Sequence, residues 1–183
     1  MLKVNRKLTI FMFCIFFATI ASVGAATDNI FICDLESNTI GPKPADTEAN
    51  GSAIFLFDEN KQELTYKLLV EKIEDAYMAH LHIGPADKEG LLAVWLYPLP
   101  GHKPAKRTIE GQFNGTLAEG VIGTEDLENG VTYEELIESL RNDNAYVNVH
   151  TEKFVMGEIR GQVHSQQYSS HIERMPPAAG LGK

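Results

Sequence analysis

Cysteine is scarce in this chain, because its 183 residues include only Cys14 and Cys33. Cys14 lies within residues 1–26, which we expect to be removed on export, so a single cysteine remains and no intramolecular disulfide can form. A domain without disulfides depends on its hydrophobic core for stability. Apolar residues make up 44% of the chain, and this supports one core and one domain, expected over residues 27–165.

Positive charge is also scarce, with 16 basic against 25 acidic residues. Removal of residues 1–26 takes away three basic residues, which leaves 13 against 25 and a net charge of about −12. Nucleic acid and anionic membranes need a basic surface, so both are disfavoured as partners. The densest basic cluster, Lys103, Lys106 and Arg107 in "PLPGHKPAKR", is a candidate contact for an extracellular protein, although solubility alone also explains it.

The first 26 residues have the pattern of a signal peptide. A basic start with Lys3, Arg6 and Lys7 precedes the apolar run "LTIFMFCIFFATIASV" and the small residues "GAA". The alternative is an uncleaved membrane anchor, but the run is shorter than the ~20 residues that a spanning helix needs. We therefore expect a secreted or cell-surface protein, in contact with a membrane only if this segment is retained.

The rest of the chain predicts a mostly β fold. Short apolar runs alternate with turn clusters: two runs flank "DENKQ", two flank "GPADKEG", and "TIEGQFNGTL" forms another strand. One helix is expected in "TYEELIESLRNDN", where Thr132 and Glu135 form a capping box. Two further strands follow in "NAYVNVHT" and "MGEIRGQVHS". Residues 166–183 are rich in Ser, Pro and Gly, which is typical of a flexible tail.

The histidines follow the period-two alternation of these strands. In "YMAHLHIGP", Leu81 and Ile83 share one face, whereas His80 and His82 share the other. In "AYVNVHT" the two valines face the core, and Tyr146, Asn148 and His150 face the opposite side. In "GEIRGQVH" the opposite side carries the polar residues Glu158, Arg160, Gln162 and His164. The sequence thus predicts a polar sheet face that holds several histidines.

A hairpin between the last two strands has one register that keeps both faces consistent. It places Asn148 opposite Arg160 and His150 opposite Glu158, whereas a shift by one residue would bury Arg160 in the core. Glu158 is then a candidate to accept the second ring N–H of His150. Arg160 is a fixed cation near the histidines that either pairs with Glu158 or a nearby aspartate, or attracts anions.

Two segments carry a family resemblance. "AHLHIGPADKEGLLAVWLY" and, some fifty residues later, "NAYVNVHTEKFVMGEIRGQV" resemble the chordin-domain (CHRD) family, over roughly Asn29 to His164. The resemblance implies an antiparallel, immunoglobulin-like β-sandwich with limited similarity to the copper/zinc superoxide dismutases. Members of the family occur in exported proteins and generally have no settled biochemical function. With the strand pattern, it predicts an all-β sandwich that includes one short helix.

The three histidines permit two interpretations. An H-x-H pair on one strand, joined by His150 of matching parity, could bind one Cu or Zn ion, with His164 as a weaker fourth candidate. Asn148, Glu158 and Arg160 would then surround the ligands. In the alternative, the histidines are hydrogen-bonding groups on a half-exposed sheet face, tied to Asn148, Glu158 or the backbone.

No pattern of catalytic residues stands out. A superoxide-dismuting copper site would use His80, His82 and His150 with Arg160, but the chain lacks the histidine-rich zinc loop and the paired cysteines of the dismutases. Its acidity would also repel superoxide. We therefore expect a non-catalytic extracellular binding or structural module whose partner is an extracellular protein or a metal ion. The alternative is a copper-binding protein or a copper-only dismutase-like enzyme.

Overall fold

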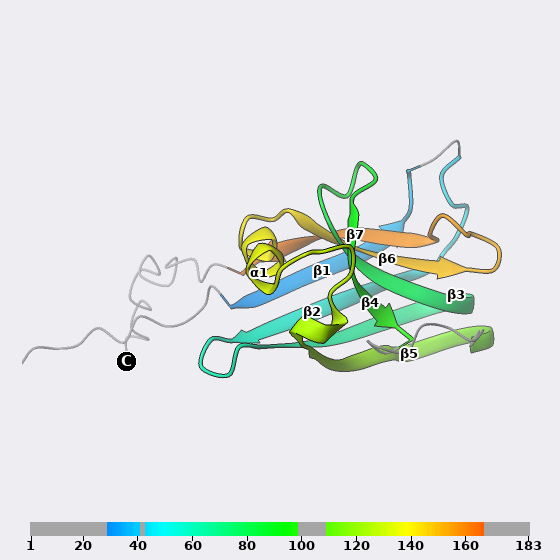
Figure 1. The fold of residues 1–183 in the computed structure, drawn as a ribbon. Helices are drawn as coiled ribbons and strands as arrows, with labels where there is room; N and C mark the ends of the chain where they lie inside the picture. The colour runs from blue at the N-terminus through cyan, green and yellow to red at the C-terminus, as the bar shows by residue number, and fades with distance from the viewer. Residues whose placement is uncertain (1–28, 41–42, 99–108, 167–183) are drawn as a thin grey trace, which may run out of the picture.

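The computed structural model describes residues 29–40, 43–98 and 109–166, which fold as an antiparallel all-β sandwich with one short α-helix (Figure 1). The predicted fold class is confirmed. The elements in these residues are β1 (Ile30–Ser37), β2 (Asn50–Asp58), β3 (Glu63–Ile83), β4 (Leu91–Tyr97), β5 (Ile109–Ile122), a 3-10 turn (Thr124–Asp126), α1 (Tyr133–Arg141), β6 (Ala145–Thr151) and β7 (Ile159–Ser165).

The strand pairings form a closed circuit. β1 pairs with β2 and β7, β7 with β6, β6 with the C-terminal part of β3, and the N-terminal part of β3 with β2. β4 and β5 pair with β3 along its other edge. In Figure 1, β6 and β7 lie in one layer and β2, β3 and β5 in the other. Because β3 pairs in both layers, it connects them.

β3 is longer than the sequence predicts, because its 21 residues join two apolar runs that the pattern assigns to separate strands. Lys72 and Asp75 adopt positive φ values of 55° and 51°, and the pairing with β5 shifts register on both sides of Ile73. Such bulges bend a strand and increase its twist. The bend carries β3 from its pairing with β2 to its pairing with β6.

The bulges also change which side chains of β3 face the core. In the N-terminal part even-numbered residues are buried, including Leu64 and Leu68. Buried positions then follow at intervals of three, at Val70, Ile73, Ala76 and Ala79, before alternation resumes at Leu81. The even-numbered His80 and His82 consequently face away from the apolar interior.

The helix α1 begins as predicted. Thr132 accepts a hydrogen bond from the backbone N–H of Glu135, and the Glu135 carboxylate accepts one from the Thr132 N–H. Leu136, Ile137 and Leu140 are buried, so the helix adds its apolar face to the core. Among the helices of the described residues, none is long and apolar enough to cross a membrane.

Several sequence predictions fall on residues outside this description. They are the signal peptide at residues 1–26, the basic loop with Lys103, Lys106 and Arg107, and the tail from residue 167 onward. Cys33 is buried in β1 without a disulfide partner in the described chain, and burial raises the pKa of its thiol to about 12.

Gly161 tests the close approach of β7 to β1. A methyl group at this position would lie 1.9 Å from the carbonyl oxygen of Asp34, so we expect Gly161→Ala to destabilise the fold by about 3 kcal/mol or more. Urea denaturation measures the change. Gly130→Ala is the control, since its methyl meets nothing within 4 Å and its φ of 77° costs only about 1 kcal/mol. Equal losses in the two variants would contradict the close packing.

Candidate functional site

The structure brings the three predicted histidines together on one face of the sheet formed by β3 and β6. His80 Nδ1 lies 3.2 Å from His150 Nε2, and the His80 and His82 ring centroids are 5.6 Å apart. His80 and His150 are 6% and 7% exposed, whereas His82 is partly buried. The predicted common face is thus confirmed, and the cluster is more enclosed than a half-exposed sheet face.

The hydrogen bonds determine which ring nitrogens carry protons. Carbonyl oxygens only accept, so His150 Nδ1 donates to Val155 O at 2.9 Å and His82 Nδ1 donates to Gly90 O at 3.3 Å. In a neutral ring the other nitrogen then carries a lone pair, and His80 Nδ1 donates to His150 Nε2. Nε2 of His80 and Nε2 of His82 remain as buried acceptors with no hydrogen-bond partner in the described structure.

Burial keeps all three rings neutral at pH 7. Loss of hydration lowers the pKa of His80 to about 3 and that of His150 to about 4, and it also lowers the pKa of His82. The neighbouring imidazoles add to this effect at His80, because they disfavour a second charge close by. Neutral imidazoles with fixed tautomers are the form in which histidine binds metals.

Asn148 lies where the register predicts, whereas the Glu158 side chain takes a different place from the one expected. The predicted register is confirmed, with Asn148 opposite Arg160, and Asn148 Nδ2 donates to Met156 O at 3.2 Å. The Glu158 carboxylate, however, accepts hydrogen bonds from Thr47 and Thr151. Because the loop before β7 turns Glu158 away, the Val155 carbonyl, and not Glu158, accepts the ring N–H of His150.

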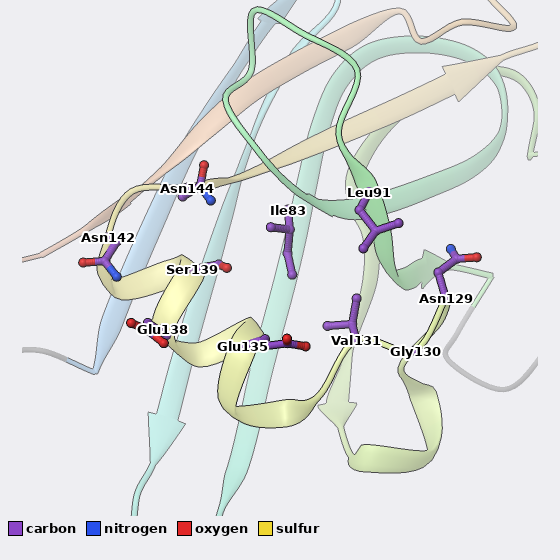
Figure 2. A pocket seen from close by; sticks show the side chains of 10 residues that line it. All are labelled: Ile83, Leu91, Asn129, Gly130, Val131, Glu135, Glu138, Ser139, Asn142 and Asn144. Carbon is purple, nitrogen blue, oxygen red and sulfur yellow. The ribbon is translucent and has the colours of Figure 1, made fainter.

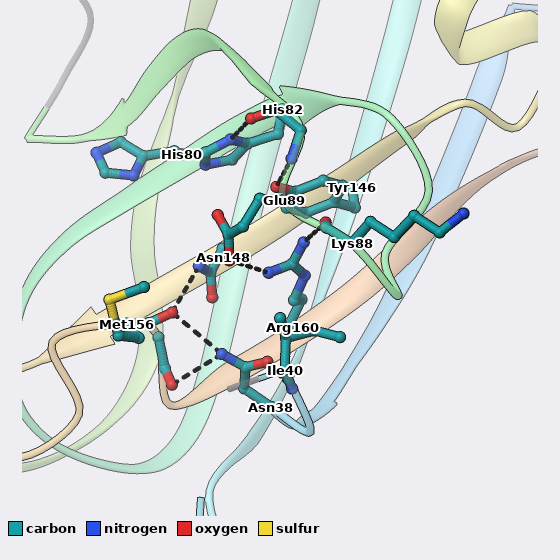
Figure 3. A network of polar contacts seen from close by, with 12 residues as sticks. Asn38, Ile40, His80, His82, Lys88, Glu89, Tyr146, Asn148, Met156 and Arg160 are labelled. Atoms are coloured by element: carbon teal, nitrogen blue, oxygen red, sulfur yellow. Dashed lines mark hydrogen bonds and ion pairs between the residues drawn. The ribbon is translucent and has the colours of Figure 1, made fainter. Parts of the chain in front are cut away.

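Arg160 belongs to a stacked column beside the histidines (Figure 3). Its guanidinium carbon lies 3.8 Å from the centroid of the Tyr146 ring, and the His82 ring stacks on Tyr146 at 4.7 Å. Arg160 Nη2 donates to Lys88 O, and Nη1 lies 3.7 Å from a carboxylate oxygen of Glu89. The acidic partner of Arg160 is therefore Glu89, and not Glu158 or an aspartate as the sequence suggested.

Two aromatic residues that the sequence did not assign complete the enclosure. The Trp95 ring stands edge-on to His80 with centroids 4.3 Å apart, and Tyr77 lies 6.4 Å from His150. Side chains alternate along "LLAVWLY", so Val94 and Trp95 face opposite sides of the sheet. Val94 is fully buried in the core, which places Trp95 on the histidine face.

His164 does not join the cluster. It is exposed and lies 3.2 Å from Asp143, at a different part of the surface. A hollow of about 480 Å³ between α1 and the ends of β3 and β4 is also separate, since no histidine lines it (Figure 2). It is lined by apolar side chains and by acids and amides, among them Ile83, Leu91, Val131, Glu135, Glu138, Asn129, Asn142 and Asn144.

The spacing within the cluster fits a metal only in part. Two ligand atoms of a tetrahedral ion with bonds of ~2.0–2.1 Å lie about 3.3 Å from each other. This is close to the 3.2 Å between His80 Nδ1 and His150 Nε2. Across the described residues, however, no three His, Cys, Asp or Glu side chains form a group already arranged to hold an ion. His80 and His150 are thus paired at ligand spacing, and His82 would have to shift to join them.

Comparison with family models identifies the fold. The model of the CHRD domain matches residues 31–163. This range contains His80, His82 and His150 and all seven strands, apart from the first residue of β1 and the last two of β7. The chain belongs to the CHRD domain family. The predicted family resemblance is confirmed over nearly the same residues. Among curated proteins and among solved structures, no match to the chain was found.

The lowered histidine pKa values predict acid sensitivity. In the unfolded chain these rings have a pKa of 6.5, so between pH 6.5 and about 4 the unfolded state binds more protons than the folded state. The stability present above pH 6.5 is therefore lost as the pH falls, by roughly 2–5 kcal/mol at pH 4.5. Urea denaturation at pH 7.0 and 4.5 measures this loss.

The double variant His80→Gln with His150→Gln provides the control. It removes the two rings with the lowest pKa, so the remaining pH dependence reflects His82 and the carboxylates. An unchanged loss of stability in this variant would show that the two histidines do not titrate as described.

Proposed function

We propose that the chain is an exported, non-catalytic binding module that holds one Cu or Zn ion between His80, His82 and His150. The observation that carries the proposal is the pair of neutral imidazole nitrogens 3.2 Å apart, with a third imidazole beside them. An ion between these two nitrogens would displace the Nδ1 proton of His80, which would move to its Nε2 so that the ring stays neutral. The carbonyls of Val155 and Gly90 already orient two of the rings, as groups around metal-binding histidines do.

Unsatisfied acceptors also favour a bound cation. Nε2 of His80 and Nε2 of His82 are buried without hydrogen-bond partners in the described structure, which costs about 1–3 kcal/mol for each group. An ion between His80 and His150 would give the Nε2 lone pair of His82 a partner after a movement of that ring, while Nε2 of His80 would carry the displaced proton.

Export rests on the basic and apolar pattern of residues 1–26. It agrees with the acidic composition of the remaining chain, which suits metal cations better than nucleic acid. A secreted or cell-surface location would bring the site into contact with extracellular metal ions and proteins.

Metal uptake tests the proposed site. We expect the metal-stripped protein to bind about one equivalent of Cu²⁺ or Zn²⁺ and to melt at a higher temperature when loaded, because an ion that binds only the folded state stabilises it. Elemental analysis and calorimetry measure the two effects. His80→Ala and His150→Ala should abolish uptake.

His164→Ala is the matched control, because His164 is exposed and pairs with Asp143 instead of joining the cluster. It should bind like the wild type. Failure of the folded wild type to bind copper in either oxidation state or Zn²⁺ would refute the metal site and leave a purely structural role for the histidines. Superoxide dismutation by the copper-loaded protein above the rate of free copper would refute the non-catalytic assignment.

A further inference from the structure

We propose that the histidine site prefers a monovalent ion of the copper class, Cu(I) or its redox-inert analogue Ag(I), over the divalent ions Cu(II) and Zn(II). This inference rests on the proposed function and names the charge of the ion that the site accepts. It follows from the charges around the three rings.

The site offers no negative ligand. Its three candidate ligands are neutral imidazoles, and His80 and His150 are almost completely buried. A metal ion held by them keeps its full charge in a poorly hydrated place. The free energy needed to remove an ion from water rises with the square of its charge, so desolvation costs about four times as much for a divalent ion as for a monovalent ion of equal size.

The nearest fixed charges increase this difference. The Arg160 side chain is 4% exposed, and its positive charge lowers the pKa of both His82 and His150. Glu89 opposes it more weakly at both rings, and its side chain is 64% exposed. The field of these two charges at His82 and His150 is therefore positive on balance, and it repels a divalent ion more strongly than a monovalent one.

The geometry allows an estimate of the effect. Two strand spacings, about 10 Å, separate the backbones of Arg160 and His80, because Asn148 lies between them. The guanidinium stacks on Tyr146 and Tyr146 on His82, so its charge lies within about the same distance of the cluster. At this distance, with an effective dielectric constant of about 20, one unit of charge on Arg160 changes affinity about tenfold for each unit of charge on the ion. Removal of the Arg160 charge should favour Zn(II) over Ag(I) by a further factor of about ten.

The test compares ions of both charges on the full chain. Affinities for Cu(I) and Ag(I), and for Zn(II) and Cu(II), are measured without oxygen by competition with coloured chelators. We expect the wild type to bind the monovalent ions more tightly. Arg160→Gln should shift the Zn(II) to Ag(I) affinity ratio about tenfold toward Zn(II), whereas the matched variant Arg160→Lys, which keeps the charge, should leave the ratio nearly unchanged.

Glu89→Gln provides a second, exposed substitution that leaves the Tyr146 stack in place. It should shift the same ratio a few-fold toward Ag(I), even if Arg160→Gln fails to fold. Tighter binding of Zn(II) and Cu(II) than of Cu(I) by the wild type, or equal shifts for both charges in the variants, would overturn the inference while the metal site stands. Failure to bind every ion would overturn both.

Discussion

The site depends on which side chains of β3 face outward after its bulges. In the N-terminal part of β3, even-numbered side chains such as Leu64 and Leu68 enter the core, and simple alternation would send His80 and His82 there too. The bulges around Lys72 and Asp75 replace this alternation with three steps of three residues. By the end of the strand, even-numbered residues face outward. The backbone distortion in the middle of β3 is therefore what presents the two imidazoles beside His150.

Burial without charge is the second property of the site. Neighbouring strands hold the rings close together, and aromatic side chains of Trp95 and Tyr77 reduce their contact with water. Neutrality makes such crowding tolerable, because two protonated rings at 3.2 Å would repel each other strongly. The same neutrality leaves lone pairs free. A cluster that is stable because it is uncharged is also a cluster of potential ligands.

Sequence reasoning was most successful where strands are short and regular. The alternation in "AYVNVHT" and "GEIRGQVH" predicted the faces and the register of β6 and β7, since a shift by one residue would have buried Arg160. It could not predict the bulges, because Lys72 and Asp75 are not glycines and give no local indication of positive φ. The predicted contact of Glu158 with His150 was wrong, because Glu158 lies just before β7 begins at Ile159 and its carboxylate is held by the hydroxyl groups of Thr47 and Thr151.

The stepwise path of β3 has a consequence for changes in chain length. Between Val70 and Ala79 every third residue points inward. Which residues of the following segment face the core therefore depends on the number of residues in this stretch, and only weakly on their identity. A side-chain substitution here alters one contact. Loss or gain of one residue in this stretch would instead exchange the inward and outward sets of the whole following segment, and bring Leu81 to the surface while the imidazoles entered the interior.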